Sequence, residues 1–186
     1  MIKKKRTVIG WAEWVTLPQL NLPLIKAKID TGARTSALHA FSIETFKKRG
    51  APWVRFQIHP LQGNRKISVT CEAPVVDRRM VTDSGGKSER RLVIETLAQI
   101  GDVTRRIEIT LTNREKMAFR MLLGRQAISK FDFLVNPAYT RMLKKVKPAI
   151  ALETYRTPVQ AAPPVTTEIP VPVDSAPLLS LQEEHP

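Results

Sequence analysis

The segment Leu24-Ile25-Lys26-Ala27-Lys28-Ile29-Asp30-Thr31-Gly32-Ala33 carries the strongest structural signal in this chain. An apolar run predicts a strand that ends by delivering Asp30 into a sharp turn. Gly32 has no side chain, so the backbone can come close to whatever the Asp30 carboxylate faces. The Thr31 hydroxyl can hold the turn through a hydrogen bond. The segment therefore predicts a carboxylate at the end of a strand, within a compact loop.

The sequence on either side of this segment is rich in short β-branched or alternating runs separated by turn residues. Ile107, Ile109 and Leu111 alternate with polar residues, as expected for a strand with one wet face. Helices are predicted only near Phe46–Arg49 and Arg125–Lys130. Many short strands with few helices indicate an all-β barrel or sandwich. The predicted strands are Val8–Leu17, Leu24–Asp30, Trp53–His59, Ile67–Ala73, Val75–Thr82, Arg91–Ile100, Thr104–Thr112 and Phe119–Leu123.

The segment Arg79–Arg91 contains two adjacent glycines between strand-like runs. Glycine tolerates positive φ, so this pattern predicts a hairpin with a flexible tip. From about Pro158 the composition changes, and residues 158–186 hold seven of the fourteen prolines. We predict a domain over residues 1–150 and a Pro-rich disordered tail over residues 151–186.

Charge is also unevenly distributed. The formal net charge is +13, and all 30 Lys and Arg residues precede residue 158. Such a field attracts polyanions or acidic peptides without identifying which is the partner. The sequence contains no apolar run long enough to cross a membrane, and Glu13 interrupts the only run that could resemble a signal peptide. A single cysteine, Cys71, excludes an intrachain disulfide. We therefore expect a cytoplasmic protein without a membrane partner.

The residues that surround Asp30-Thr31-Gly32-Ala33, together with Met121-Leu122-Leu123-Gly124-Arg125 far downstream, resemble the retroviral-type aspartic peptidases. The longer string Lys28–Ala40, which reads KIDTGARTSALHA, is most similar to a bacterial branch labelled ATP-dependent zinc protease. Members of that branch often accompany an ATP-grasp ligase that adds glutamates to a small-subunit ribosomal protein. The resemblance covers roughly residues 7–140. It implies an all-β, small closed acid-protease barrel with one short helix.

The resemblance also implies roles for individual residues. Asp30 would be the catalytic carboxylate, in an active-site loop formed with Thr31, Gly32 and Ala33. The loop would be supported from behind by Leu122, Leu123, Gly124 and Arg125. A flap would close over the substrate, and it would involve Arg79, Asp83, Ser84, Gly85, Gly86, Arg90 and Arg91, with Arg34 nearby. Flap closure would exclude water and position the peptide.

One carboxylate is a poor catalyst of peptide hydrolysis, whereas two carboxylates about 3 Å apart share a proton and can act as acid and base. Asp83-Ser84-Gly85 is a permitted variant of the motif and an internal candidate for the second half. It lies too close to Asp30 in sequence for a second lobe, and it lacks its own downstream apolar-apolar-Gly. We therefore expect a homodimer that pairs Asp30 with its own copy. The competing interpretation is that Asp30 merely ends a strand in an Asx-type turn.

Neither zinc nor ATP is supported by the sequence itself. The three histidines are His39, His59 and His185, and neither His-Glu-x-x-His nor Cys-x-x-Cys occurs. A His39/His59/Cys71 site is not favoured by the spacing, and Cys71 is expected to be a buried structural thiol. Gly86-Lys87-Ser88 lacks the earlier glycine of a phosphate loop, because Val81 stands there. We expect no cofactor, no metal and no nucleotide.

The function predicted from the sequence is that of an aspartic endopeptidase, a hydrolase acting on a peptide or protein substrate. The arginines Arg34, Arg78, Arg79, Arg90 and Arg91 suggest an acidic or glutamate-rich substrate, bound by charge-assisted pairing. The accompanying ligase in the similar branch suggests a link to a ribosomal protein. The alternative is a non-catalytic basic binding module associated with the ribosome or RNA, which the net charge also fits.

Overall fold

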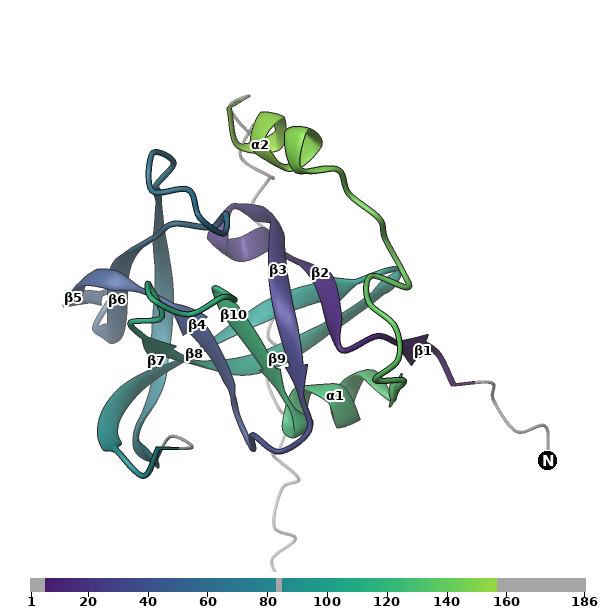
Figure 1. Ribbon diagram of the computed structural model, residues 1–186. Coiled ribbons are helices and arrows are strands. Elements are labelled where there is room, and N and C mark those ends of the chain that lie inside the picture. Colours follow the sequence, from purple (N-terminus) through teal and green to yellow (C-terminus); the bar gives the residue numbers. More distant parts are fainter. Residues whose placement is uncertain (1–5, 83–84, 157–186) are drawn as a thin grey trace, which may run out of the picture.

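The structure, a computed structural model, describes residues 6–82 and 85–156. Within these residues it contains a large sheet, a small two-stranded sheet, one 3-10 helix (η1) and two α-helices (Figure 1). In chain order the elements are β1 Val8–Ile9, β2 Ala12–Leu17, η1 Pro18–Leu20, β3 Leu22–Asp30, β4 Ser36–His39, β5 Phe41–Lys48, β6 Ala51–Ile58, β7 Val69–Thr82, β8 Ser88–Ile100, β9 Val103–Thr112, β10 Met121–Gly124, α1 Arg125–Phe131, β11 Leu134–Val135 and α2 Pro148–Arg156.

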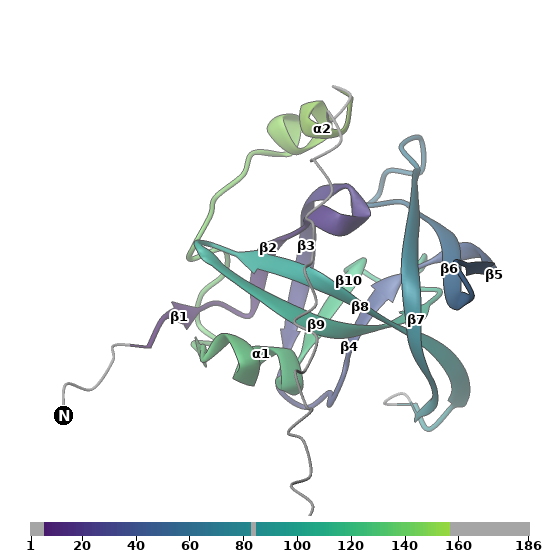
Figure 2. The ribbon, with the colours of Figure 1, turned by 180° about the vertical axis from the view of Figure 1, so that it is seen from behind.

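Six strands form a closed barrel in the order β2-β3-β10-β4-β9-β8. A pairing between Thr16 of β2 and Gln99 of β8 closes it. Beyond β8 the sheet continues through β7, β6 and β5, so β5 is an outer edge (Figure 2). The small all-β closed barrel expected from the sequence is therefore confirmed.

Alternating apolar residues form the core of the barrel. Ile107, Ile109 and Leu111 of β9 are all buried, as their alternation predicts. Thr110, on the other face of β9, is also buried, and its hydroxyl donates a hydrogen bond of 2.9 Å to the carbonyl of Ser36. The short helix α1 packs Ala127, Ile128 and Phe131 against the same core. Burial of this apolar surface is the main force that closes the barrel.

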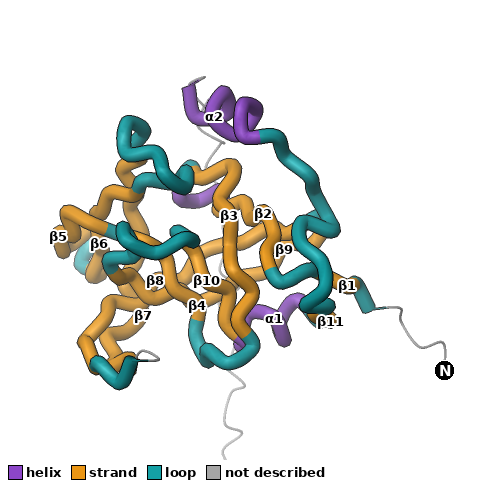
Figure 3. Tube along the Cα trace, in the orientation of Figure 1, coloured by secondary structure: helices purple, strands orange, loops and turns teal. Residues whose placement is uncertain are grey.

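Several predicted elements differ from the observed ones. Phe46–Arg49 was expected to be helical, but residues up to Lys48 belong to the edge strand β5. The two strands predicted on either side of Pro74 form one strand, β7, in which Pro74 lies opposite Trp53 of β6. The expectation of a single helix was wrong, since α2 follows α1 as a second one (Figure 3). Helix α2 crosses the predicted boundary at residue 150, and residues 157–186 of the predicted tail lie outside the described residues.

Both ends of the described chain are tied together by buried polar contacts. Glu13 of β2 is fully buried, and its carboxylate accepts hydrogen bonds from the backbone N–H groups of Gly10 at 2.7 Å and Met142 at 2.9 Å. Tyr155 of α2 donates its hydroxyl to the carbonyl of Leu24 at 2.7 Å. Buried polar groups with such partners fix the position of a segment. Early strands and late loops therefore form one unit.

Neither α-helix within residues 6–82 and 85–156 has the length and apolar character that crossing a membrane would require.

Candidate functional site

Asp30 stands at the carboxyl end of β3, at the barrel surface. Its side chain is 26% exposed, and the two residues that follow, Thr31 and Gly32, are exposed. The Oδ1 atom accepts hydrogen bonds of 3.1 Å from the backbone N–H groups of Gly32 and Ala33. The Oδ2 atom lies 3.5 Å from Lys28 Nζ. One carboxylate oxygen is thus fixed by the loop, and the other lies beside Lys28 on a side chain that is partly exposed.

The Asx-type turn proposed as the competing interpretation is present, because Asp30 caps the amides of its own loop. The turn is nevertheless part of a larger arrangement. Strand β10 runs parallel to β3, so that Gly124 is the partner of Asp30 and Leu123 is the partner of Ile29. A strand from far along the chain therefore supports the loop from behind.

Gly124 is required at this place by close packing. A Cβ atom on Gly124 would lie 2.6 Å from the carbonyl carbon and oxygen of Thr35 and 3.0 Å from the carbonyl oxygen of Ala33. The Gly124 N–H group donates to the Ser36 hydroxyl at 3.2 Å. Glycine permits such contact between two backbones. The loop of residues 31–35 and the β10–α1 junction are therefore packed directly against each other.

Arg125 completes the support of the loop. Its backbone N–H donates to the Ala33 carbonyl at 2.9 Å, and its guanidinium donates to the Gly32 carbonyl at 2.9 Å. Behind it Leu123 is buried, while Leu122 is half-buried. The structure thus brings together every residue predicted for the loop and for its support.

The predicted hairpin is formed by β7 and β8, and it extends from the barrel at the same end as the loop of residues 31–35 (Figure 1). Its register pairs Arg79 with Arg91 and Met80 with Arg90. Directly paired residues of an antiparallel ribbon share a face, and neighbours along a strand alternate. Arg79 and Arg91 therefore lie on one face and Arg90 on the other, so the predicted arginine group is divided. Asp83 and Ser84 lie outside the described residues; Gly85 and Gly86 are exposed.

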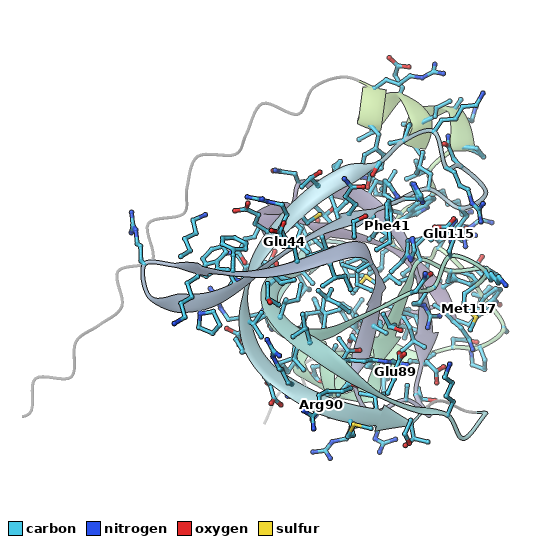
Figure 4. All side chains as sticks on the ribbon, turned by 90° about the vertical axis from the view of Figure 1, so that its left-hand side faces the viewer. Phe41, Glu44, Glu89, Arg90, Glu115 and Met117 are labelled. Carbon is cyan, nitrogen blue, oxygen red and sulfur yellow. The ribbon has the colours of Figure 1, made fainter. Side chains whose placement is uncertain are left out.

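Arg79 and Arg91, which share one face of the hairpin, both have acidic partners. Arg79 contacts Asp77 at 2.7 Å and Glu108 at 2.9 Å, and Arg91 pairs with Glu89. Figure 4 shows Glu89 and Arg90 as neighbours along the hairpin. Arg34 is exposed on the active-site loop. Because ion pairs already engage Arg79 and Arg91, the predicted role of these residues in binding an acidic substrate would require exchange of partners.

Arg114 is a candidate site residue that the sequence did not reveal. It follows β9, and its Nε donates to the Phe119 carbonyl at 3.2 Å. Burial lowers the pKa of its guanidinium from the ordinary value; Arg91 lowers this pKa further, whereas Asp30 opposes the shift. The charge of the candidate catalytic carboxylate therefore contributes to the electrostatic surroundings of this guanidinium. No motif marks an isolated arginine after a strand, so only the fold could identify it.

A second polar cluster lies where β4, β6 and the 113–120 loop meet. His39 Nε2 and His59 Nδ1 each lie 2.8 Å from the same oxygen of Glu115, Oε2. The other oxygen, Oε1, lies 2.9 Å from guanidinium nitrogens of Arg65 and Arg120. These ion pairs and hydrogen bonds outweigh burial and lower the pKa of Glu115 to about 2, whereas burial lowers the pKa of His39. Figure 4 shows Glu115 beside Phe41, whose ring stacks on His59.

The His39/His59/Cys71 set, which the spacing did not favour, is not assembled. Cys71 is buried in β7, where its thiol donates to the Leu20 carbonyl at 3.2 Å, and Glu115 takes the third place beside the two histidines. The expected structural role of Cys71 fits this burial. The sequence did not predict that Glu115 would join this cluster, because long stretches of chain separate it from both histidines and it belongs to no recognisable motif.

Comparison with known proteins gives a consistent picture. A family profile described as the RimB-like retropepsin-like aspartic endopeptidases matches residues 8–146. Proteins named probable alpha-L-glutamate ligase are similar: that of Shewanella pealeana is 50% identical over 131 residues, or 70% of this chain, and that of Desulfotalea psychrophila is 43% identical over 141 residues, or 76%. The chain spans only 28% and 30% of the length of these two relatives.

Among solved structures, a protein of unknown function from Legionella pneumophila is similar, with a TM-score of 0.65 and 32% identity. The match covers 75% of this chain and all of that protein. The sequence profile spans the whole barrel, including the Asp30 loop and the β10 support. The chain therefore belongs to the RimB-like family of retropepsin-like aspartic endopeptidases.

Proposed function

We propose that this chain is one half of a dimeric aspartic endopeptidase, in which Asp30 of two copies forms the catalytic pair. The observation that carries the proposal is the position of Asp30. Its Oδ1 is fixed by two backbone amides, and its Oδ2 lies 3.5 Å from Nζ of the partly exposed Lys28. Within residues 6–82 and 85–156 no hydrogen bond joins Asp30 to a second carboxylate. A twofold axis close to the loop would supply that carboxylate from another copy.

The chemistry follows from pairing. Two carboxyl groups held about 3 Å apart retain one proton between them. The ionised group removes a proton from a water molecule, which attacks the peptide carbonyl carbon, while the protonated group donates to the carbonyl oxygen. The rigid support from Gly124 and Arg125 suits this role, since misplacement by a fraction of an ångström weakens catalysis. The β7–β8 hairpin would close over the bound peptide.

We propose further that the substrate is acidic and contains glutamate. The half-buried Arg114, whose guanidinium is influenced by the charge of Asp30, offers a cation of the kind that pairs with a carboxylate. Relatives of this chain are named as glutamate ligases, which suits a substrate built from glutamate. The glutamate-modified ribosomal protein suggested by the resemblance is the partner we would test first.

The decisive experiment mixes subunits. Wild-type chain is combined with increasing amounts of Asp30→Asn, subunits are allowed to exchange, and cleavage of a glutamate-rich peptide is followed. A shared site requires two intact copies. When wild type and Asp30→Asn are mixed in equal amounts, about one quarter of the randomly formed dimers contain two wild-type copies. The mixture should therefore have about one quarter of the activity of pure wild type at the same total protein concentration. Asp102→Asn, which makes the same change in the exposed β8–β9 turn, should cause no such loss.

A proportional fall to half would mean that each chain acts alone, and it would overturn the shared site. Full peptide cleavage by Asp30→Asn alone would remove the catalytic role of Asp30 and with it the aspartic mechanism. The alternative function, a non-catalytic basic binding module, is supported by the formal net charge of +13. It predicts salt-sensitive RNA binding that Asp30→Asn leaves unchanged, without peptide cleavage by the wild type.

A further inference from the structure

We propose that His39, His59 and Glu115 form a binding site for a divalent transition-metal ion, independent of the Asp30 site. The three side chains come from separate parts of the chain: the end of β4, the residue after β6, and the loop after β9. Each offers one donor atom, and these atoms all lie within 4.8 Å of one another. An ion there would tie three segments of the barrel together.

The donor set suits the metal chemically. Two imidazole nitrogens and one carboxylate oxygen are a combination that Zn²⁺ accepts, with an open fourth position for water. Bonds of about 2.0–2.1 Å in a tetrahedral arrangement place donors about 3.3 Å apart. The observed separations of 2.8 Å from Glu115 Oε2 to each histidine nitrogen need only a small opening.

The buried nitrogen of His39 supplies an independent indication. The His39 side chain is fully buried, and Nε2 makes no hydrogen bond although Oε2 of Glu115 is 2.8 Å away, because the direction between them is unsuitable. A buried polar atom without a hydrogen bond is unusual in a folded protein. An ion bound by the nitrogen and the oxygen would satisfy both groups once the ring proton has moved from Nε2 to Nδ1.

The surroundings of Glu115 hold it in place for this role. Arg65 and Arg120 hydrogen-bond to Oε1 and leave Oε2 directed at the histidines. Metal-binding carboxylates are commonly oriented by such contacts. Glu115 also lines an open surface pocket together with Gln62, Gly63, Lys116 and Met117, which gives an ion a route from solvent.

Metal binding has one structural consequence. In the metal-free chain His39 Nδ1 accepts a hydrogen bond of 3.1 Å from the Arg114 amide, so this nitrogen carries no proton. A neutral imidazole that binds metal through Nε2 carries its proton on Nδ1. The Arg114 amide must then give up this hydrogen bond. Occupancy of the site would therefore change the hydrogen bonding of the Arg114 amide.

The test uses the full chain without an affinity tag, stripped of metal and titrated with Zn²⁺ in a calorimeter. We expect one equivalent per chain, a Zn²⁺-dependent rise in the melting temperature, and an X-ray absorption spectrum with two imidazoles and no sulfur. His59→Ala and Glu115→Gln should weaken binding at least ten-fold. Glu72→Gln removes another carboxylate that pairs with two basic side chains, and His185→Ala removes the remaining histidine; neither should change binding.

Failure of the wild type to bind Zn²⁺, Co²⁺ or Mn²⁺ saturably would overturn the proposal, as would a sulfur ligand or equal affinity in Glu115→Gln. Circular dichroism establishes that each variant is folded; should His59→Ala unfold, the X-ray absorption of the wild type still decides the ligands. The shift of the Arg114 amide resonance on adding Zn²⁺ is a further check. Each of these measurements is independent of peptidase activity.

Discussion

Gly124 is the parallel-strand partner of Asp30, and it packs so closely against the carbonyl of Thr35 that no side chain fits between them. The loop that holds the candidate catalytic carboxylate is therefore shaped from behind by a residue far away in sequence. This contact between Gly124 and Thr35 distinguishes the loop from an ordinary turn, because both the position and the stability of the loop depend on it.

We expect Gly124→Ala to destabilise the chain by about 1–3 kcal/mol and to reduce cleavage, because the new methyl group meets backbone atoms that cannot move aside. Gly32→Ala is the matched comparison: its Cβ would meet only Asp30 Oδ1, at 3.3 Å. That variant should unfold in urea close to the wild type while still losing activity. Equal stability of Gly124→Ala and wild type would contradict the packing argument.

Arg114→Ala should reduce kcat/KM for a glutamate-rich peptide by about 10- to 100-fold, as expected for loss of a charge-assisted contact. A neutral peptide should be affected much less. Arg105→Ala, which removes an exposed arginine of β9 outside the predicted substrate-binding set, serves as the control. Steady-state kinetics at low and high salt measure both effects, and a similar loss for both peptides would show that Arg114 does not select acidic substrates.

Cys71 should be inert toward thiol reagents in the native chain at neutral pH. Burial raises the pKa of the thiol to about 12, so the reactive thiolate is nearly absent. Because the folded-state pKa is above the unfolded one, the associated stability is present at neutral pH and is lost as pH rises from about 9 toward 12. Iodoacetamide labelling with and without urea measures the first effect. Urea unfolding of wild type and Cys71→Ala across that pH range measures the second.

Tyr155→Phe should lower the free energy of unfolding by about 1 kcal/mol, because the Leu24 carbonyl loses a donor. Burial raises the pKa of the Tyr155 hydroxyl far above its ordinary value, so it remains a donor at all pH values used for assays. In hydrogen-exchange measurements, Tyr155→Phe should speed up exchange of the α2 amides relative to wild type more than it speeds up exchange in the barrel core. An unchanged α2 would mean that apolar packing alone holds the helix.

The sequence was sufficient for those parts of the structure that local patterns encode. The apolar strand ending at Asp30 and the alternation in β9 could be predicted because each follows from residues close together in the chain, whereas the Leu122-Leu123-Gly124 support was implied by the family resemblance. Strand β5 could not, since as an exposed edge strand it shows no apolar alternation and its charged residues resemble a helix surface. The cluster of His39, His59 and Glu115 could not be predicted either, because these residues come together only when the barrel closes, and no short segment of the sequence specifies that closure.

The buried carboxylate of Glu13 has a consequence for synthesis of the chain. Its partners include the amides of Met142 and Leu143, which leave the ribosome long after β2 has emerged. Until they arrive, this acid has to remain hydrated, so the first strands cannot be sealed against the interior. The barrel should therefore complete itself late, and a nascent chain arrested before residue 142 should remain open to proteases and chaperones.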